Sequence, residues 1–203
     1  MVKHFDEAKD AGDSLHHVYN LPAILSFLPK TRSTLLDAGC GNGSLTAKLA
    51  NLGHTVVGID TTPANIDVAK AHFPQAKFYC RSVYEDLSDI LPDKVDVCVS
   101  CEVIEHLYSP DDFIDGMAKV LRPGGLVILT TPYHGWLKNL AISVVNGWDK
   151  HFMVHHEGAH IKFFSKDTLF AMLSRHGFTN LKFRGAGRLP YLWASMAVCA
   201  ERP

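Results

Sequence analysis

The sequence lacks an apolar run of the ~20 residues that a bilayer-spanning helix needs. Its N-terminal segment, MVKHFDEAKDAGDSLHH, has no apolar core of the kind found in secretory signals. We therefore expect no transmembrane segment and a cytoplasmic protein. An excess of one charge is also lacking, because 20 Lys and Arg stand against 21 Asp and Glu. A protein that binds nucleic acid through its overall field is not expected.

Cysteine is scarce and its spacing suggests no disulfide framework. The number is odd, which favours reduced thiols and an intracellular protein; the residues are Cys40, Cys80, Cys98, Cys101 and Cys199. Cys98 and Cys101 have the spacing of metal ligands, but residues i and i+3 of a strand face opposite sides of a sheet. We expect these two thiols to pack in the core. With 203 residues, 47% of them hydrophobic and 20% charged, the chain suits a single domain over 1–203 and excludes disorder and coiled coils.

Short apolar segments alternate with helical patterns along most of the chain. Strands are expected at 35–37, 55–59, 77–79, 95–99 and 126–130, and helices at 44–52, 63–72 and 111–121. The sequence RPGG at 122–125 is expected to form a turn. Continuous apolar strands that alternate with helices indicate an α/β fold whose parallel sheet is covered on both faces.

The two ends of the chain differ from this alternation. Two N-terminal helices are expected within 13–30, the second beginning at Pro22. Near the other end, a helix at 166–176 precedes two strands at 179–184 and 192–200. The segment between these strands is too short for a crossover helix, so we expect them to pair antiparallel.

A glycine-rich loop follows the first strand. Gly39, Gly41 and Gly43 lie between Asp37, at the end of that strand, and the helix that begins at Ser44. Glycine permits positive φ and lets the backbone approach a ligand closely. The third glycine comes one residue too early for G-x-G-x-x-G, and Asp37 would repel a pyrophosphate but attract a cationic amino acid. The pattern favours a nucleoside with a zwitterionic or cationic tail, with a simple tight turn as the alternative.

An acidic residue, Asp60, ends the second strand. At this point of a doubly wound fold a carboxylate can accept hydrogen bonds from both ribose hydroxyls. The alternative is an acid at the N-terminus of the helix that follows at Pro63.

Four segments resemble, in this order, the motifs of class I S-adenosylmethionine-dependent methyltransferases: LLDAGCGNGSLTAKLA (35–50), VVGID (56–60), VDVCVSCEVIEHL (95–107) and LRPGGLVILTTP (121–132). The resemblance implies a Rossmann-like, doubly wound, seven-stranded sheet, mostly parallel with a reversed last strand. It also implies S-adenosylmethionine as cofactor. The implied contacts are Gly39, Cys40 and Gly41 packing on the cofactor, Asp60 on the ribose with Thr61 beside it, Ser82 and Val83 near the adenine, and the backbone of Cys101 and Glu102 near the methionine end. Many members carry Asp at the position of Ser82, so the resemblance implies a weaker or backbone-made contact there.

An acidic cluster follows the apolar strand at 95–99. If the chain turns helical there, Glu102, Glu105 and His106 share a face and can hold a divalent metal at the carboxyl edge of the sheet. The alternatives are a capping cluster without metal and His106 acting alone as a general base. The E-x-x-E-H element with HIKFFS at 160–165 resembles two subgroups, the ubiquinone-pathway O-methyltransferases and the small-RNA 3′-terminal 2′-O-methyltransferases. The second implies a divalent metal, Mg or Zn, held by Glu102, Glu105, His106 and His160.

A long insertion at 133–164 is expected to form a cap. Its histidines are His134, His151, His155, His156 and His160, and its apolar residues at i, i+4 steps are Trp136, Leu140, Val144 and Trp148. The apolar stripe predicts one of three things: ordinary packing of a lid, a hydrophobic cap over the substrate, or peripheral membrane contact through 136–148. The histidines are either solvated and locally bonded or metal ligands.

These observations predict methyl transfer from S-adenosylmethionine to a small-molecule acceptor, at a hydroxyl of a quinol- or phenol-like compound, with His106 as the catalytic residue. Basic residues are sparse and the chain has no further domain for RNA, so a small acceptor is favoured over nucleic acid. The alternatives are a 2′-O-methyltransferase for a small RNA end and a non-catalytic module that binds S-adenosylmethionine. A more remote one is an NAD-dependent oxidoreductase, which would share the glycine loop and Asp60 but not Asp37 or a reversed last strand.

Overall fold

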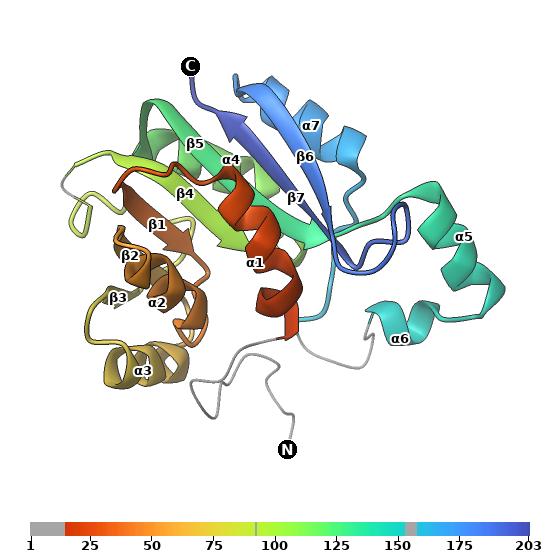
Figure 1. The fold of residues 1–203 in the computed structure, drawn as a ribbon, viewed down its shortest axis with the longest axis horizontal. Helices are drawn as coiled ribbons and strands as arrows, with labels where there is room; N and C mark the ends of the chain where they lie inside the picture. Colours follow the sequence, from red (N-terminus) through yellow and green to blue (C-terminus); the bar gives the residue numbers. More distant parts are fainter. Residues whose placement is uncertain (1–14, 92, 153–157) are drawn as a thin grey trace.

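A seven-stranded sheet forms the centre of the protein, in the order β3-β2-β1-β4-β5-β7-β6 (Figure 1). The computed structural model describes residues 15–91, 93–152 and 158–203. The strands are β1 (Thr34–Ala38), β2 (Thr55–Asp60), β3 (Lys77–Cys80), β4 (Val95–Cys101), β5 (Leu121–Pro132), β6 (Thr179–Ala186) and β7 (Ser195–Glu201). The strands β1 to β5 pair in parallel, whereas β7 runs antiparallel to both β5 and β6. The mostly parallel sheet with a reversed last strand is thereby confirmed.

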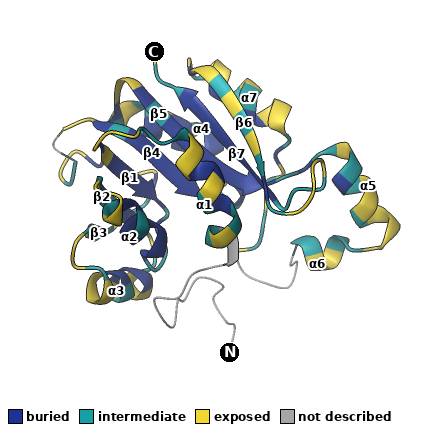
Figure 2. Ribbon diagram, in the orientation of Figure 1, coloured by how far each residue is buried: buried dark blue, intermediate teal, exposed yellow. Residues whose placement is uncertain are grey.

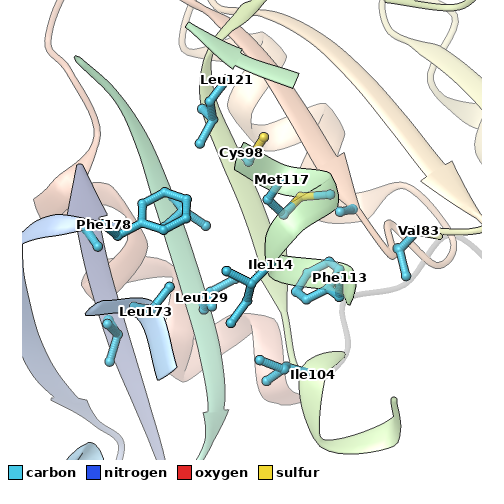
Figure 3. Packing of buried hydrophobic residues seen from close by; sticks show 14 of the residues in the cluster. Val83, Cys98, Ile104, Phe113, Ile114, Met117, Leu121, Leu129, Leu173 and Phe178 are labelled. Carbon is cyan, nitrogen blue, oxygen red and sulfur yellow. The ribbon is translucent and has the colours of Figure 1, made fainter. Parts of the chain in front are cut away.

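Helices cover both faces of this sheet. They are α1 (Leu15–Phe27), α2 (Ser44–Asn51), α3 (Pro63–His72), the 3₁₀ turn η1 (Ile104–His106), α4 (Pro110–Val120), α5 (Trp136–Val144), α6 (Trp148–Phe152) and α7 (Lys166–Arg175). One face packs on α1 and α2 through residues such as Ile24 and Leu49. The other packs on α4 and α7, where Ile114 and Leu173 contact the same core as Leu129 of β5 (Figure 3). Helices α5 and α6 extend away from the sheet (Figure 1).

Burial on both faces explains the continuous apolar sequences of the central strands (Figure 2). Successive residues of a strand face opposite sides, so Cys98 packs in the core under α4, whereas Cys101 packs in the core under α1 and α2. All five cysteines are free thiols. The prediction that Cys98 and Cys101 face opposite sides of the sheet and pack in the core is confirmed.

Two local expectations were wrong. The segment expected to contain two helices forms one described helix, α1, with Pro22 inside it; residues 13 and 14 lie outside the described residues. Pro22 lacks the N–H that would bond to the carbonyl of Val18, and Val18 is exposed, so water can satisfy that carbonyl. The expected turn at 122–125 is part of β5, where a register shift opposite Val95–Val97 accommodates Gly124 at φ 71°.

The carboxyl ends of β1, β2, β4 and β5 meet at one edge of the sheet. Because β7 is reversed, its first residue, Ser195, pairs with Pro132 at the end of β5 and reaches the same edge. The segment with Ser82 and Val83 follows β3, which runs parallel to β2, and the other segments expected to carry chemistry lie at or follow the ends of β1, β2, β4 and β5. The single-domain organisation of 1–203 stays a prediction.

Candidate active site

The glycine loop after β1 presents bare backbone at Gly41. The amides of Gly39 and Cys40 both donate to the carbonyl of Ile59 at 2.8 Å, which fixes the loop against the end of β2. A Cβ at Gly39 would lie 2.4 Å from Cγ2 of Val103, whereas a Cβ at Gly41 would meet no atom within 4 Å. Gly41, at φ 53°, is therefore the point of this loop where a ligand can reach the backbone.

Asp37 is completely buried behind this loop. Its Oδ2 accepts a hydrogen bond of 2.6 Å from the hydroxyl of Thr46 in α2, and its Oδ1 has no hydrogen-bond partner among the described residues. Burial raises the pKa of Asp37 to about 7, an effect that the Thr46 hydroxyl partly opposes. A buried acceptor of this kind is suited to a donor or a positive charge supplied by a ligand.

Asp60 ties the second strand to the glycine loop. Its Oδ2 accepts from the amide of Gly41 at 3.0 Å and its Oδ1 from the amide of Thr62 at 2.8 Å. The carbonyl of Asp60 accepts from the amide of Arg81 at 3.0 Å. This bond holds the segment with the expected adenine-side residues against the end of β2; Ser82 there is partly buried, Val83 is buried, and Thr61 after Asp60 is exposed.

Two of the expected cofactor residues have buried thiols that are occupied by protein contacts. The Cys40 side chain packs with Ile66, Ala69 and Phe78, so its backbone is the part left for a ligand. The Sγ of Cys101 lies 3.3 Å from the hydroxyl oxygen of Thr130, and burial raises the pKa of the Cys101 thiol. Neither side chain is an exposed thiolate.

Glu102 stands at the end of β4 in a strained backbone conformation, with φ at 56°. Its Oε1 accepts three hydrogen bonds, from Asn20 Nδ2 at 3.0 Å, Thr130 Oγ1 at 3.0 Å and Ser195 Oγ at 2.6 Å. These donors come from α1, β5 and β7. The strand end is thus fixed by three elements that are far apart in the sequence.

A potential metal-binding group forms next to Glu102. Glu105, His106 and His160 each bring one ligand atom to within 4.8 Å of the others. The rings of His106 and His160 are edge to face, with centroids 5.0 Å apart. Of the four residues expected to form this group, three come together, and Glu102 is not among them.

The cap segment is attached directly to this group. The amides of Ile161 and Lys162 donate to the carbonyl of Glu105 at 2.9 and 3.0 Å. The Nδ1 of His106 bonds to the carbonyl of Gly158 at 2.5 Å, which leaves its Nε2 for a ligand.

The Glu105 carboxylate is fully buried, and neither of its oxygens has a hydrogen-bond partner among the described residues. Burial, and then the neighbouring charge of Glu102, raise the pKa of Glu105 well above its ordinary value. A buried, unpaired carboxylate beside two imidazoles is a donor set that divalent cations accept. The residues present therefore fit a metal ion.

The apolar stripe of α5 is exposed. Trp136 and Val144 have 76% and 77% of their surface accessible, and Leu140 is also exposed, so ordinary lid packing is wrong for these three. Trp148 of α6 instead stacks on Phe152 with centroids 4.9 Å apart. A pocket of about 350 Å³ lies beside them; it is lined by His134, Asn139, Trp148, Phe152, Phe163, Ser165 and Thr168. We call it the cap pocket.

Three histidines of the insertion are described, and each lies beside another histidine. His160 joins His106, as described, and His134 lies edge to face with His151 at 5.1 Å between centroids. His155 and His156 lie outside the described residues.

Four residues of the site were missed at the sequence level: Asn20, Thr130, Ser195 and Lys138. The first three bond to Glu102, and the fourth is a buried lysine that donates to the carbonyl of Ala194, the residue before Ser195. No sequence motif marks them, because each is an ordinary residue of α1, β5, β7 or α5 and gains its role only from the packing of these elements.

Comparison with known proteins gives concordant matches. Residues 14–182 match the family model described as a methyltransferase domain. A ubiquinone biosynthesis O-methyltransferase from Cereibacter sphaeroides is 32% identical over 173 residues, 82% of this chain and 68% of that protein.

Solved structures share the fold at lower identity. A chain of the complex between the Haloferax volcanii Trm112 methyltransferase activator and a methyltransferase superposes with a TM-score of 0.74, at 16% identity, over 93% of this chain and 90% of that one. The magnesium protoporphyrin IX methyltransferase from Synechocystis with bound SAH gives 0.72, at 19% identity, over 95% and 90%. Within the part of the chain that the structure describes, no helix has the length and apolar character needed to cross a membrane.

Proposed function

The chain belongs to the class I S-adenosylmethionine-dependent methyltransferases, and from this premise we propose that it methylates a hydroxyl group of a small, quinol- or phenol-like acceptor. The methyl donor follows from the family, and a nicotinamide oxidoreductase is thereby excluded. The acceptor is the proposal. The observation that carries it is the group formed by Glu105, His106 and His160 at the carboxyl end of β4, because O-methylation needs a hydroxyl held and deprotonated beside the donor. The O-methyltransferase relative at 32% identity supports it.

The cofactor is proposed to lie along the carboxyl edge from β3 to β4. Asp60 accepts from the ribose hydroxyls, and the open backbone at Gly41 allows close approach. The adenine lies toward Ser82 and Val83, and Thr61 borders the ribose. The backbone of Gly39, Cys40 and Cys101, together with the buried carboxylate of Asp37, accommodates the methionine end.

His106 is the proposed catalytic residue. Its Nδ1 is bound to the carbonyl of Gly158, so the neutral ring donates there and leaves a lone pair on Nε2. Nε2 can take the proton of the acceptor hydroxyl as the oxygen attacks the methyl carbon in line with the breaking carbon–sulfur bond, and S-adenosylhomocysteine leaves as a neutral thioether. Most of the rate acceleration comes from holding the oxygen and the methyl carbon in contact in this orientation.

As the alternative to His106 acting as the base, a divalent metal, Mg or Zn, is proposed to be held by Glu105, His160 and Nε2 of His106. When bound, it would lower the pKa of the acceptor hydroxyl. The carboxylate of Glu105 supplies the negative charge, and the cap contacts at Ile161 and Lys162 keep its backbone in place. Glu102 positions the strand end through its three hydrogen bonds.

The test is transfer of labelled methyl from S-adenosylmethionine to catechol, with and without EDTA, in the wild type and in His106→Ala. We expect activity in the wild type and at least a 100-fold loss of kcat in the variant, as is typical when an acid–base group is removed. The matched control is His72→Ala, at the exposed end of α3, which should retain full activity.

Unchanged activity in His106→Ala, with no effect of EDTA, would show that neither the base nor the metal contributes. Methyl transfer to the 3′ end of a short RNA, without transfer to phenolic compounds, would contradict the proposed small acceptor and favour the RNA alternative. Binding of S-adenosylmethionine without transfer to any acceptor would favour the non-catalytic alternative.

The exposed stripe of α5 is proposed to touch a membrane surface peripherally. Trp136, Leu140 and Val144 present apolar surface on one face of a short helix. Sedimentation with phosphatidylglycerol vesicles should be lost in Trp136→Ser/Val144→Ser, and equal sedimentation of wild type and variant would contradict this contact.

A further inference from the structure

Asn20 of α1 is a fully buried amide with only one of its two polar ends satisfied. Its Nδ2 lies 3.0 Å from Oε1 of Glu102, 3.3 Å from Oγ1 of Thr130 and 3.8 Å from Sγ of Cys101. Its Oδ1 is buried and has no hydrogen-bond partner among the residues that the structure describes. Buried polar atoms without a partner are rare in proteins, so this oxygen is an acceptor that a ligand can complete.

The orientation of the Asn20 amide is determined by its partners. Exchanging Oδ1 and Nδ2 would place the amide oxygen 3.0 Å from the carboxylate oxygen of Glu102. Two acceptors at that distance repel each other, whereas an NH₂ group donates to the carboxylate. The NH₂ group therefore faces the end of β4, and Oδ1 is the end that lacks a partner.

The face of α1 that carries Asn20 spans the region between the glycine loop and the end of β4. His17 lies three residues before Asn20 and so on the same face of the helix. Its Nδ1 is 2.7 Å from Oγ of Ser44, the first residue of α2 after the loop. One turn of α1 thus contacts the start of α2 through His17 and the end of β4 through Asn20.

A second buried acceptor without a partner among the described residues, Oδ1 of Asp37, lies on the same side of the sheet. Asp37 bonds to Thr46 of α2 and pairs in register with Val99 of β4. Cys101, which Asn20 contacts, follows Val99 by two residues, roughly 7 Å further along the strand and on the same side. Two unsatisfied acceptors, one of them on a carboxyl group, therefore face the α1 and α2 side of adjacent strand ends.

The chemistry of these two acceptors restricts the group that can complete them. An acceptor needs an N–H or O–H donor, so the sulfonium of S-adenosylmethionine, which has neither, satisfies neither atom. A carboxylate offers no donor and would be repelled by the charge of Asp37. In the methionine portion of the cofactor only the α-ammonium carries N–H groups. Its three donors and its positive charge suit a carboxyl oxygen and an amide oxygen together.

We infer that Asn20 is a cofactor-binding residue outside the methyltransferase motifs, and that its Oδ1 accepts a hydrogen bond from the α-ammonium of S-adenosylmethionine, which also bonds to Oδ1 of Asp37. The inference rests on the proposed function, because the methionine portion is proposed to lie between the glycine loop and the end of β4. Nδ2 of the same amide bonds to Glu102, so Asn20 joins the cofactor to the strand end that precedes Glu105 and His106. Helix α1 is thereby one wall of the cofactor site.

The experiment compares two ligands by titration calorimetry. They are S-adenosylhomocysteine and its deaminated analogue, in which a hydrogen atom replaces the α-ammonium. We expect the wild type to bind S-adenosylhomocysteine about 100-fold more tightly, because the analogue leaves both buried acceptors without a donor. The ratio of the two affinities is the preference for the ammonium.

Two variants separate the two ends of the Asn20 amide. Asn20→Leu has a side chain of similar size without polar atoms, and it should reduce the preference about tenfold. Asn20→Asp loses the NH₂ group that bonds to Glu102 but retains an acceptor, so it should keep the preference of the wild type. Asn20→Ala also removes the acceptor and serves if the leucine variant does not fold. Asn51→Leu, at the exposed end of α2, is the matched control and should leave the preference unchanged.

Equal affinity of the wild type for the two ligands would overturn the inference, and so would an undiminished preference in Asn20→Leu. The same loss of preference in Asn20→Asp as in Asn20→Leu would also overturn it, because Asn20 would then act through Glu102 alone. Failure of the wild type to bind S-adenosylhomocysteine would overturn it together with the proposed cofactor site. Because all of these readouts are affinities, a failure to methylate catechol would count against the proposed acceptor alone.

Discussion

Replacing the buried carboxylate of Asp37 with an amide should change how stability depends on pH. Burial raises the pKa of this residue to about 7, whereas its value in the unfolded chain is about 4. Between these values the native protein retains a proton that the unfolded chain has lost, so the free energy of unfolding decreases as pH rises. The contribution of Asp37 to the free energy of unfolding is fully present below pH 4 and is lost by about pH 7.

The size of the expected change in unfolding free energy follows from the interval between the two pKa values of Asp37. From pH 5 to pH 8 the native carboxyl resists ionisation over about two pH units, and each unit corresponds to about 1.4 kcal/mol, so the wild type should lose about 3 kcal/mol relative to Asp37→Asn. The amide keeps an acceptor for Thr46. Any penalty from its buried NH₂ group is the same at both pH values and cancels in the difference.

The assay is guanidinium unfolding followed by tryptophan fluorescence at pH 5, 6, 7 and 8. Contributions from all other carboxylates and histidines occur in both proteins and cancel when the two curves are subtracted. Parallel pH profiles for wild type and Asp37→Asn would refute the reasoning, since they would mean that Asp37 ionises as readily in the folded protein as in the unfolded chain.

Two further predictions concern the glycine loop and a surface histidine. Gly41→Ala should weaken S-adenosylmethionine binding at least tenfold in calorimetry. The control is Gly53→Ala in the turn before β2, where φ is also positive, at 95°, and the space is equally open; it should cost about 1 kcal/mol of stability and leave binding unchanged. Equal binding in both variants would contradict a ligand at Gly41. The ring nitrogens of His176 lie 2.6 Å from carboxylate oxygens of Asp111 and Asp115, and these hydrogen bonds raise the pKa of His176. The stability that His176 contributes to the folded protein is therefore present below pH 6.5 and is lost as the pH rises through the raised pKa. His176→Asn should therefore lower the unfolding free energy by less than about 1 kcal/mol at pH 5 and by nothing at pH 9, and a loss that is equal at both pH values would exclude the ion pairs as its cause.

Local sequence patterns predicted those parts of the fold that depend on neighbouring residues. The helix expected at 63–72 occurs at Pro63–His72, because a proline in its first turn and the apolar spacing of Ile66 and Ala69 act within the helix itself. The opposite facing of Cys98 and Cys101 followed from the two-residue repeat of a strand. The order of the motifs along the chain placed every candidate segment at the carboxyl edge.

Local sequence patterns gave wrong predictions where contacts between segments far apart in the sequence determine the structure. Pro22 would end a helix in isolation, but α1 continues because Ala23 and Ile24 are buried against the sheet. Glu102 was assigned to a helical face with Glu105, whereas its backbone adopts φ 56° and its carboxylate bonds to Asn20, Thr130 and Ser195. The partners lie at sequence separations of 82, 28 and 93 residues, beyond any local periodicity.

The reversed strand β7 also determines when the sheet can form during synthesis. It lies between β5 and β6, and six of its seven residues, Ser195–Ala200, are buried. Until the ribosome has released residues 195–201, β5 and β6 each expose an unpaired, partly apolar edge. The order of the strands therefore leaves the nascent chain open to edge-to-edge aggregation until the seventh strand inserts, and a chain stopped before Ser195 would retain that hazard.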